Sequence, residues 1–240
     1  MLRIIPTLLF LAVVCFCVPT AAQTEASPRT AEKVDTAHII AEFTAGEDEF
    51  LAALRKYGYR TDIVVQSVSN GKATGEYRRS TRIVLKDGKP QTVVIDAPRP
   101  SLIELSVTPD DIAGLSAEYQ YLLGTANAGK YDITYNGKET VQSLDLYLFD
   151  VKPKTANNKE LLFSGRVWVS VANLRIVKLR RDAMKKGNQR FPFTEYYRKV
   201  IDGRYLFPYQ TIAEDKLTFS SGQSANVRTL AEYSEFARLP

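Results

Sequence analysis

Cysteine and histidine are almost missing from this chain. Of its 240 residues two are cysteine, Cys15 and Cys17 near the N-terminus, and one is histidine, His38. Without further such side chains the common nucleophilic triads and zinc sites cannot be assembled. The sequence also has no Gly-x-Ser-x-Gly pattern and no glycine-rich phosphate loop. We therefore expect a protein that is not an enzyme and that uses no cofactor and no metal. A carboxylate pair assembled from distant strands stays open as an alternative.

Long hydrophobic runs are missing as well, apart from one at the start. The run 4–18 follows the single charge of Arg3 and precedes small residues at 20–22, a pattern typical of a secretory signal peptide. It is shorter than the roughly twenty residues that span a bilayer. We expect a signal peptide over 1–22, a flexible lead-in over 23–42 and one domain over 43–240. The expected location is the periplasm, with secretion from the cell as the alternative.

A helix is indicated where the lead-in ends. Thr44 and Glu47 have the spacing of a capping box, acidic residues follow in the first turn, and Gly58 is expected to end the helix. A second helix is expected over 116–123, and a helical turn is expected over 109–111. The two acids of that turn, Asp110 and Asp111, are interpreted as first-turn acids.

Most of the remaining chain alternates with a period of two, which is typical of strands. The expected strands are 61–68, 77–85, 92–95, 131–135, 140–151, 161–171, 174–180, 195–201, 205–213 and 227–236. Four hairpin turns are predicted at Asn70-Gly71, Asp87-Gly88, Asn136-Gly137 and Asp202-Gly203, because tight primed turns need positive φ. We predict a mainly β (α+β) fold, in which a large curved antiparallel sheet forms an incomplete barrel with two or more helices as a lid. A sandwich of two sheets would give a similar pattern.

Several of these strands carry large apolar residues on both faces. Tyr147 and Phe149 alternate with leucines, and Trp168 alternates with valines. Such residues either pack within an ordinary sheet or line a concave apolar site. The candidate ligand-lining residues are Leu115, Tyr119 and Leu122 of the second helix, together with Tyr147, Phe149, Trp168 and Phe207.

A basic segment over 175–190 holds seven cations and one acid, Asp182. Its candidate contacts with a lipid headgroup, an anionic membrane surface or an envelope protein partner are Arg180, Arg181, Lys185 and Lys186. A solvated hairpin is the alternative interpretation. Nucleic acid is not an expected partner, because an exported protein rarely meets it.

Several short stretches together resemble a known family. They are Gly165-Arg166-Val167-Trp168-Val169, the run 174–178, the run 201–208 and a closing strand that reaches Tyr233 and Phe236. Over roughly residues 43–237 the chain resembles bacterial outer-membrane lipoprotein-sorting proteins, the lipoprotein-carrier-like half-barrels. The resemblance implies an incomplete antiparallel barrel whose concave side, covered by helices, accepts acyl chains. No ligand contact of that family is carried over to a residue here, and the superfamily also includes envelope-stress sensors.

The expected function is therefore that of an exported soluble carrier or sensor. It would bind a lipid, the acyl chains of a lipoprotein or a similar hydrophobic ligand in the cell envelope, without catalysis. The alternative is a structural or interaction protein of the envelope with a filled core and no ligand.

Overall fold

The computed structural model describes residues 34–101, 108, 111, 123–155, 162–186 and 188–240. The chain divides into two units, 1–34 and 35–240, and the fold below is that of the second. Its elements are α1 (Thr36–Leu54), β1 (Tyr57–Ser69), β2 (Lys72–Lys86), β3 (Lys89–Asp96), α3 (Thr125–Ala128), β4 (Tyr131–Val141), β5 (Leu144–Pro153), β6 (Gly165–Ser170), β7 (Ile176–Arg181), β8 (Met184–Lys186), β9 (Gln189–Phe191), β10 (Thr194–Ile201), β11 (Tyr205–Thr218) and β12 (Ser224–Arg238).

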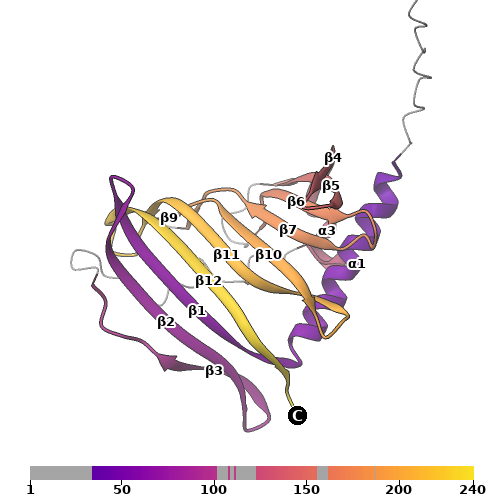
Figure 1. The fold of residues 1–240 in the computed structure, drawn as a ribbon. Helices are drawn as coiled ribbons and strands as arrows, with labels where there is room; N and C mark the ends of the chain where they lie inside the picture. Colours follow the sequence, from indigo (N-terminus) through magenta and orange to yellow (C-terminus); the bar gives the residue numbers. More distant parts are fainter. Residues whose placement is uncertain (1–33, 102–107, 109–110, 112–122, 156–161, 187) are drawn as a thin grey trace, which may run out of the picture. The chain divides into compact units, whose positions relative to one another are not determined.

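Twelve strands form one antiparallel sheet, which curves past α1 (Figure 1). The strand order is β3-β2-β1-β12-β11-β10-β7-β6-β5-β4, and the short strands β8 and β9 pair with each other and, through β9, with β11. Among the described strands β3 and β4 are the two edges and do not pair with each other, so the sheet stays open. The prediction of a mainly β fold with a large open antiparallel sheet is confirmed. In the part of the chain that is described, no helix is long and apolar enough to cross a membrane.

Three of the four predicted hairpin turns are confirmed. Asn70, Asp87 and Asp202 and the glycines that follow them all have positive φ, as primed turns require. The fourth prediction is wrong. Asn136-Gly137 lies inside β4, at a register shift between Tyr135 and Lys138, and the turn to β5 is made by Gln142 and Ser143, which both have positive φ. The Asn-Gly pair makes a bulge here, in which Gly137 has a positive φ of 103°.

Helix α1 begins eight residues before the predicted N-cap. Asp35 caps it, and the Asp35 carboxylate accepts a hydrogen bond of 3.0 Å from the backbone N–H of His38. Thr44 lies inside the helix, where its hydroxyl donates to the carbonyl of Ala41. The helix ends at Leu54, and Gly58 belongs to β1. The capping-box and stop signals therefore placed the helix wrongly, and residues 36–42 are helical.

A glycine lies within α1 although it costs a helix about 1 kcal/mol relative to alanine. In the structure a Cβ at position 46 would collide with the guanidinium of Arg175. Arg175 crosses the helix at this point and donates to the Glu42 carbonyl at 3.3 Å and to the Glu49 carboxylate at 2.9 Å. Gly46 therefore allows the close contact between α1 and Arg175.

The sheet has an inner face, defined here as the face of Val65 and Phe149, and an outer face on the other side. One row of cross-strand neighbours follows the inner face from β2 to β5. Its members are Arg79, Ile63, Ala231, Thr211, Tyr196, Leu179, Val167 and Phe149. From Ala231 to Phe149 every residue of the row is at most 2% exposed, so the core lies on this face.

Two segments fill most of the inner face. Helix α1 packs against it through ring contacts of Phe43 with Phe149 and of Phe50 with Phe207, with centroids 5.6 and 5.4 Å apart. Phe191 of β9 packs in a second cluster with Val65. One helix thus covers part of the sheet as predicted. The second predicted helix, 116–123, is described only at its last residue.

Candidate functional site

Strands β2 and β3 extend the inner face beyond the part that these segments fill. Leu85 of β2 and Val94 of β3 lie on the same face as Val65, by strand alternation and register. Val65 is fully buried, whereas Leu85 is 37% and Val94 is 49% exposed. Ile83, between them in the register, is half-buried. The apolar surface that forms the core elsewhere is therefore partly open to solvent at this end of the sheet.

Arg79 brings a charge to this surface. It lies directly opposite Ile63 and two residues from Tyr77 in β2, so its side chain belongs to the inner face. It is half-buried, and no hydrogen bond or ion pair joins its guanidinium to the described part of the chain. Over 61–67, 75–85, 90–94 and 227–233 the other inner positions of these strands are uncharged. They are Thr61, Ile63, Val65, Ser67, Gly75, Tyr77, Thr81, Ile83, Leu85, Pro90, Thr92, Val94, Val227, Thr229, Ala231 and Tyr233.

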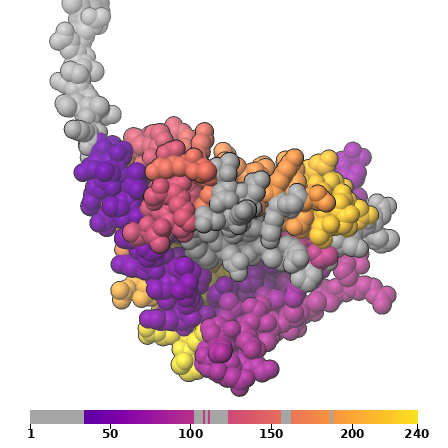
Figure 2. All heavy atoms as spheres, turned by 180° about the vertical axis from the view of Figure 1, so that it is seen from behind, coloured from indigo at the N-terminus to yellow at the C-terminus, as the bar shows by residue number. Residues whose placement is uncertain are grey.

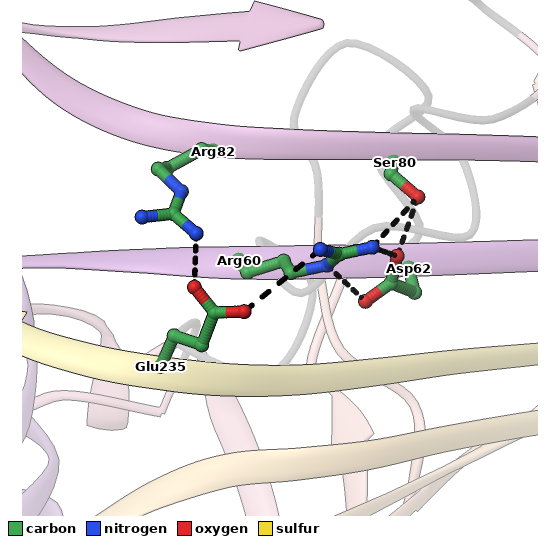
Figure 3. A network of polar contacts seen from close by, with 5 residues as sticks. All are labelled: Arg60, Asp62, Ser80, Arg82 and Glu235. Atoms are coloured by element: carbon green, nitrogen blue, oxygen red, sulfur yellow. Dashed lines mark hydrogen bonds and ion pairs between the residues drawn. The ribbon is translucent and has the colours of Figure 1, made fainter. Parts of the chain in front are cut away.

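The outer face of the same strands carries a network of paired charges around Arg60 (Figure 3). Arg60 donates to Asp62 at 2.7 and 2.8 Å, and Ser80 donates to the same carboxylate. Glu235 of β12 accepts from Arg82 and lies 3.8 Å from Arg60. The hydrogen bond from Arg60 lowers the pKa of Asp62, so this carboxylate is ionised at neutral pH. The two arginines and the two acids of this network therefore neutralise one another on the outer face.

Figure 2 shows the molecule from the side that carries α1. In this view α1 lies along one side, and the magenta strands β2 and β3 form the opposite side. The apolar residues at the β2–β3 end of the inner face, Ile63, Ile83, Leu85 and Val94, are called the open surface below.

A cavity of about 430 Å³ lies beside α1, at the other end of the sheet. Its floor holds a buried ion pair in which Arg198 of β10 donates to both carboxylate oxygens of Glu47, at 2.5 and 2.8 Å. The two side chains are 1% and 4% exposed, and the guanidinium lies 4.6 Å from the centre of the Phe50 ring. Because each charge is satisfied by the other, this ion pair fixes the helix to the sheet.

The described members of the predicted ligand-lining set lie on both faces of the sheet. Phe149 and Phe207 are fully buried on the inner face beneath α1. Tyr147 is half-buried, beside Tyr135 and beneath the Lys138 ammonium. Leu115, Tyr119 and Leu122 lie outside the described residues.

Trp168 points to the outer face, opposite to Phe149. It is 7% exposed in a small cluster with Leu146 and Leu148. Its indole N–H donates to Glu139 at 2.5 Å, and the Lys178 ammonium lies 4.7 Å from its ring centre. Trp168 and Phe149 therefore belong to two separate layers of packing.

The basic residues also divide between solvent and interior. Arg180 and Lys185 are exposed, and Lys186 belongs to β8. Arg181 is 1% exposed and donates to Thr194 at 3.0 Å, so it faces the core. A polar depression of about 660 Å³ lies at Lys185 and Lys216, where Arg190 pairs with Asp215 at 3.0 Å.

Asp111 has a larger structural role than a first-turn acid. It is 1% exposed and accepts hydrogen bonds from Thr108, from Gln189 at the start of β9 and from Ser220 after β11. Burial alone raises the pKa of Asp111, but these hydrogen bonds outweigh it and lower the pKa. Asp111 therefore ties three distant segments together as a carboxylate. Among the described residues no group of three or more His, Cys, Asp or Glu side chains is arranged to hold a metal ion.

Sequence reasoning missed Arg79, although the sequence contains a signal for it. In the predicted strand 77–85, Tyr77, Thr81, Ile83 and Leu85 alternate with Arg78, Ser80 and Arg82. The same alternation places Arg79 among the apolar residues. A charged residue at an apolar position of an amphipathic strand is the pattern that identifies it.

No family model matches the sequence, and no curated protein matches it. Several solved structures resemble the fold. A LolA superfamily protein from Nitrosomonas europaea is 17% identical, with a TM-score of 0.41, covering 86% of this chain and 94% of that one. A DUF1329 family protein from Desulfovibrio piger is 15% identical, with a TM-score of 0.40, covering 82% and 93%. An outer membrane lipoprotein-sorting protein domain from Vibrio parahaemolyticus is 12% identical, with a TM-score of 0.42, covering 80% and 93%.

The family that the sequence resembles is thus named in one of these structures, the outer membrane lipoprotein-sorting protein domain from Vibrio parahaemolyticus.

Proposed function

We propose that the chain is a binding protein of the cell envelope, a carrier or sensor that holds the apolar part of a lipid or lipoprotein against the open surface. The observation that carries the proposal is the exposure of Leu85 and Val94 on the face that is fully buried at Val65. Exposed apolar surface of this kind marks a binding site in soluble proteins. The periplasm is the compartment that the N-terminal apolar run favours.

Burial of an apolar chain supplies the binding energy. Each buried methylene contributes about 0.8 kcal/mol, so about ten methylenes contribute roughly 8 kcal/mol before the entropic cost of association. Strand β2 offers a track for such a chain, since the six residue-to-residue steps from Arg79 to Leu85 extend about 20 Å. This kind of binding requires shape and apolar contact, and it needs no bond-making group.

A charge placed on the open surface tests the proposal. Val94→Glu puts a carboxylate on the inner face at a position that is 49% exposed, so the fold should tolerate it. Val93→Glu is the matched control, because Val93 is the adjacent residue and lies on the outer face opposite Arg82. We expect Val94→Glu to abolish the rise in melting temperature that oleyl alcohol gives the wild type, and Val93→Glu to keep it.

The absence of any stabilisation by lipid would contradict the proposal. If oleyl alcohol, fatty acids and lipopeptides leave the melting temperature of the wild-type protein unchanged, and organic extraction of the purified protein releases no lipid, then the open surface is not a lipid site. A ligand that binds only the native state must stabilise it.

A second candidate is a structural or interaction protein of the envelope with a filled core. The observation in its favour is the filling of the inner face by α1 and by Phe191 and Phe219, which are fully buried. In that case the sheet edge at β3 or β4 would pair with a partner strand. Co-purification with an envelope protein at high salt, together with no stabilisation by lipid, is the result that favours this candidate.

The basic segment extends the first proposal to the membrane surface. Lys185 and Arg180 are exposed, and Lys185 lies in the depression beside Lys216. Contacts of these cations with anionic headgroups are worth about 1 kcal/mol each near a charged bilayer. Sedimentation with vesicles containing phosphatidylglycerol, but not with neutral vesicles, and its loss in Lys185→Gln are the expected results.

A further inference from the structure

The arginines of β1 and β2 are not equivalent. Arg60, Arg78 and Arg82 lie on the outer face, and each has an acidic partner, Asp62, Glu76 and Glu235 respectively. Arg79 is the neighbour of Arg78 in sequence but lies on the inner face, opposite Ile63. It is half-buried and has no acidic partner in the described part of the chain. Three arginines are neutralised by the sheet itself, and the fourth is not.

A half-buried guanidinium without a counter-ion is an unfavourable arrangement in a folded protein. Removing a charge from water is costly unless it is paired, and arginine is well suited to bidentate recognition of carboxylates and phosphates. No acid occupies any inner position of β1, β2, β3 or β12 within the paired register. The counter-ion of Arg79 must therefore come from outside these strands.

The position of Arg79 relates this charge to the apolar track. Along β2 the inner positions after Arg79 are Thr81, Ile83 and Leu85, and Val94 of β3 lies opposite Thr81. A molecule with an anionic group at one end and an apolar chain at the other would place its anion at Arg79 and its chain along Ile83 and Leu85. A wholly apolar molecule would leave the guanidinium uncompensated.

We propose that the ligand of the open surface is an anionic amphiphile, a single apolar chain ending in a carboxylate or a phosphate, and that Arg79 binds its anionic group. This inference rests on the proposed lipid-binding function and specifies the ligand class. A charge-assisted hydrogen bond contributes about 1.5–3 kcal/mol, which corresponds to an affinity change of about tenfold to a hundredfold.

The test compares three probes with the same hydrocarbon chain: oleate, oleyl phosphate and oleyl alcohol. Each is titrated calorimetrically, below its micellar concentration, into the wild type, Arg79→Gln and Arg78→Gln. Arg78 is the matched control because it is adjacent, exposed and paired with Glu76 on the outer face. We expect Arg79→Gln to weaken oleate and oleyl phosphate about tenfold or more and to leave oleyl alcohol unchanged. Arg78→Gln should change none of the three, and Arg79→Lys should restore part of the anion binding.

The arms of this experiment separate its possible failures. A stronger effect on oleyl phosphate than on oleate identifies phosphate as the preferred anion, and the reverse identifies a carboxylate. Equal affinity of Arg79→Gln and wild type for oleate overturns the role of Arg79 and leaves the lipid site intact. An equal loss for oleate and oleyl alcohol shows that Arg79 is only structural. If none of the probes binds to the wild type, the proposed function fails together with this inference.

Discussion

The two ends of the inner face are built from the same kind of strand but are covered differently. At the α1 end Leu179 and Phe149 are fully buried, and the helix is fixed by the ion pair of Glu47 with Arg198. At the β2–β3 end Leu85 and Val94 stay exposed, and Arg79 has no acidic partner among the described residues. The free energy of apolar burial already stabilises the fold at the first end. At the second end the apolar surface is still exposed, so its burial by a ligand can still supply free energy. This is the physical difference between a core and a binding surface.

The largest expected effect on stability comes from a substitution at the end of the inner face that α1 covers. Glu47→Ala leaves Arg198 buried without its carboxylate, so we expect a loss of about 3–5 kcal/mol in the free energy of unfolding. Urea unfolding followed by circular dichroism measures it. The control is Glu49→Ala, because Glu49 is 66% exposed in its ion pair with Arg175, and this substitution should cost at most about 1 kcal/mol. Replacing both members of the buried pair, Glu47→Leu with Arg198→Met, should recover most of the stability. Equal effects of Glu47→Ala and Glu49→Ala would contradict the anchoring role of the pair.

Each end of the inner face has a leucine, so the same substitution, leucine to alanine, can be compared at both ends. Leu179 is fully buried and Leu85 is 37% exposed. Leu179→Ala should destabilise the fold by about 2–5 kcal/mol, whereas Leu85→Ala should change the free energy of unfolding by at most about 0.5 kcal/mol. For binding of oleyl alcohol the order should reverse, with the larger loss of affinity in Leu85→Ala. Similar destabilisation by both variants would mean that the open surface is part of the core.

Replacing Asp111 should have a smaller effect on the free energy of unfolding, and this effect should depend on pH. Its pKa is lowered below the ordinary value of 3.8, so the ionised form stabilises the native state. This contribution is present above the unfolded-state pKa and is lost as the pH falls through the folded-state pKa. Asp111→Asn should therefore cost about 1.5–3 kcal/mol at pH 7, and the difference from wild type should shrink as the pH is lowered below about 4. Chemical unfolding at pH 7 and at pH 3 measures this, and a constant difference at both values would refute it.

Local signals in the sequence predicted the strands and most turns. Asn70-Gly71, Asp87-Gly88 and Asp202-Gly203 form the expected hairpins because positive φ is a property of the turn residues themselves. Asn136-Gly137 has the same local preference but is used in a bulge. Whether the Asn-Gly pair forms a turn or a bulge depends on the register in which β4 pairs with β5. The pair itself does not specify that register.

The start of α1 could not be predicted for a related reason. Thr44 and Glu47 have the spacing of a capping box, but in the structure Glu47 pairs with Arg198, which is distant in the sequence. The buried pair of Glu47 and Arg198 is separated by 151 residues. Charged residues of this kind look like surface residues in the sequence, because their burial depends on a partner that periodicity does not reveal.

By itself the sequence determined the alternation of side chains along each strand, and with it the inner position of Arg79. Alternation is a property of the extended backbone, in which successive side chains point to opposite faces. Only the tertiary structure decided that this position lies beyond the cover of α1, and that Trp168 and Phe149 face different layers. Cover depends on which distant segments pack together, since burial is a sum over contacts and the period of one strand contains no information about its partners.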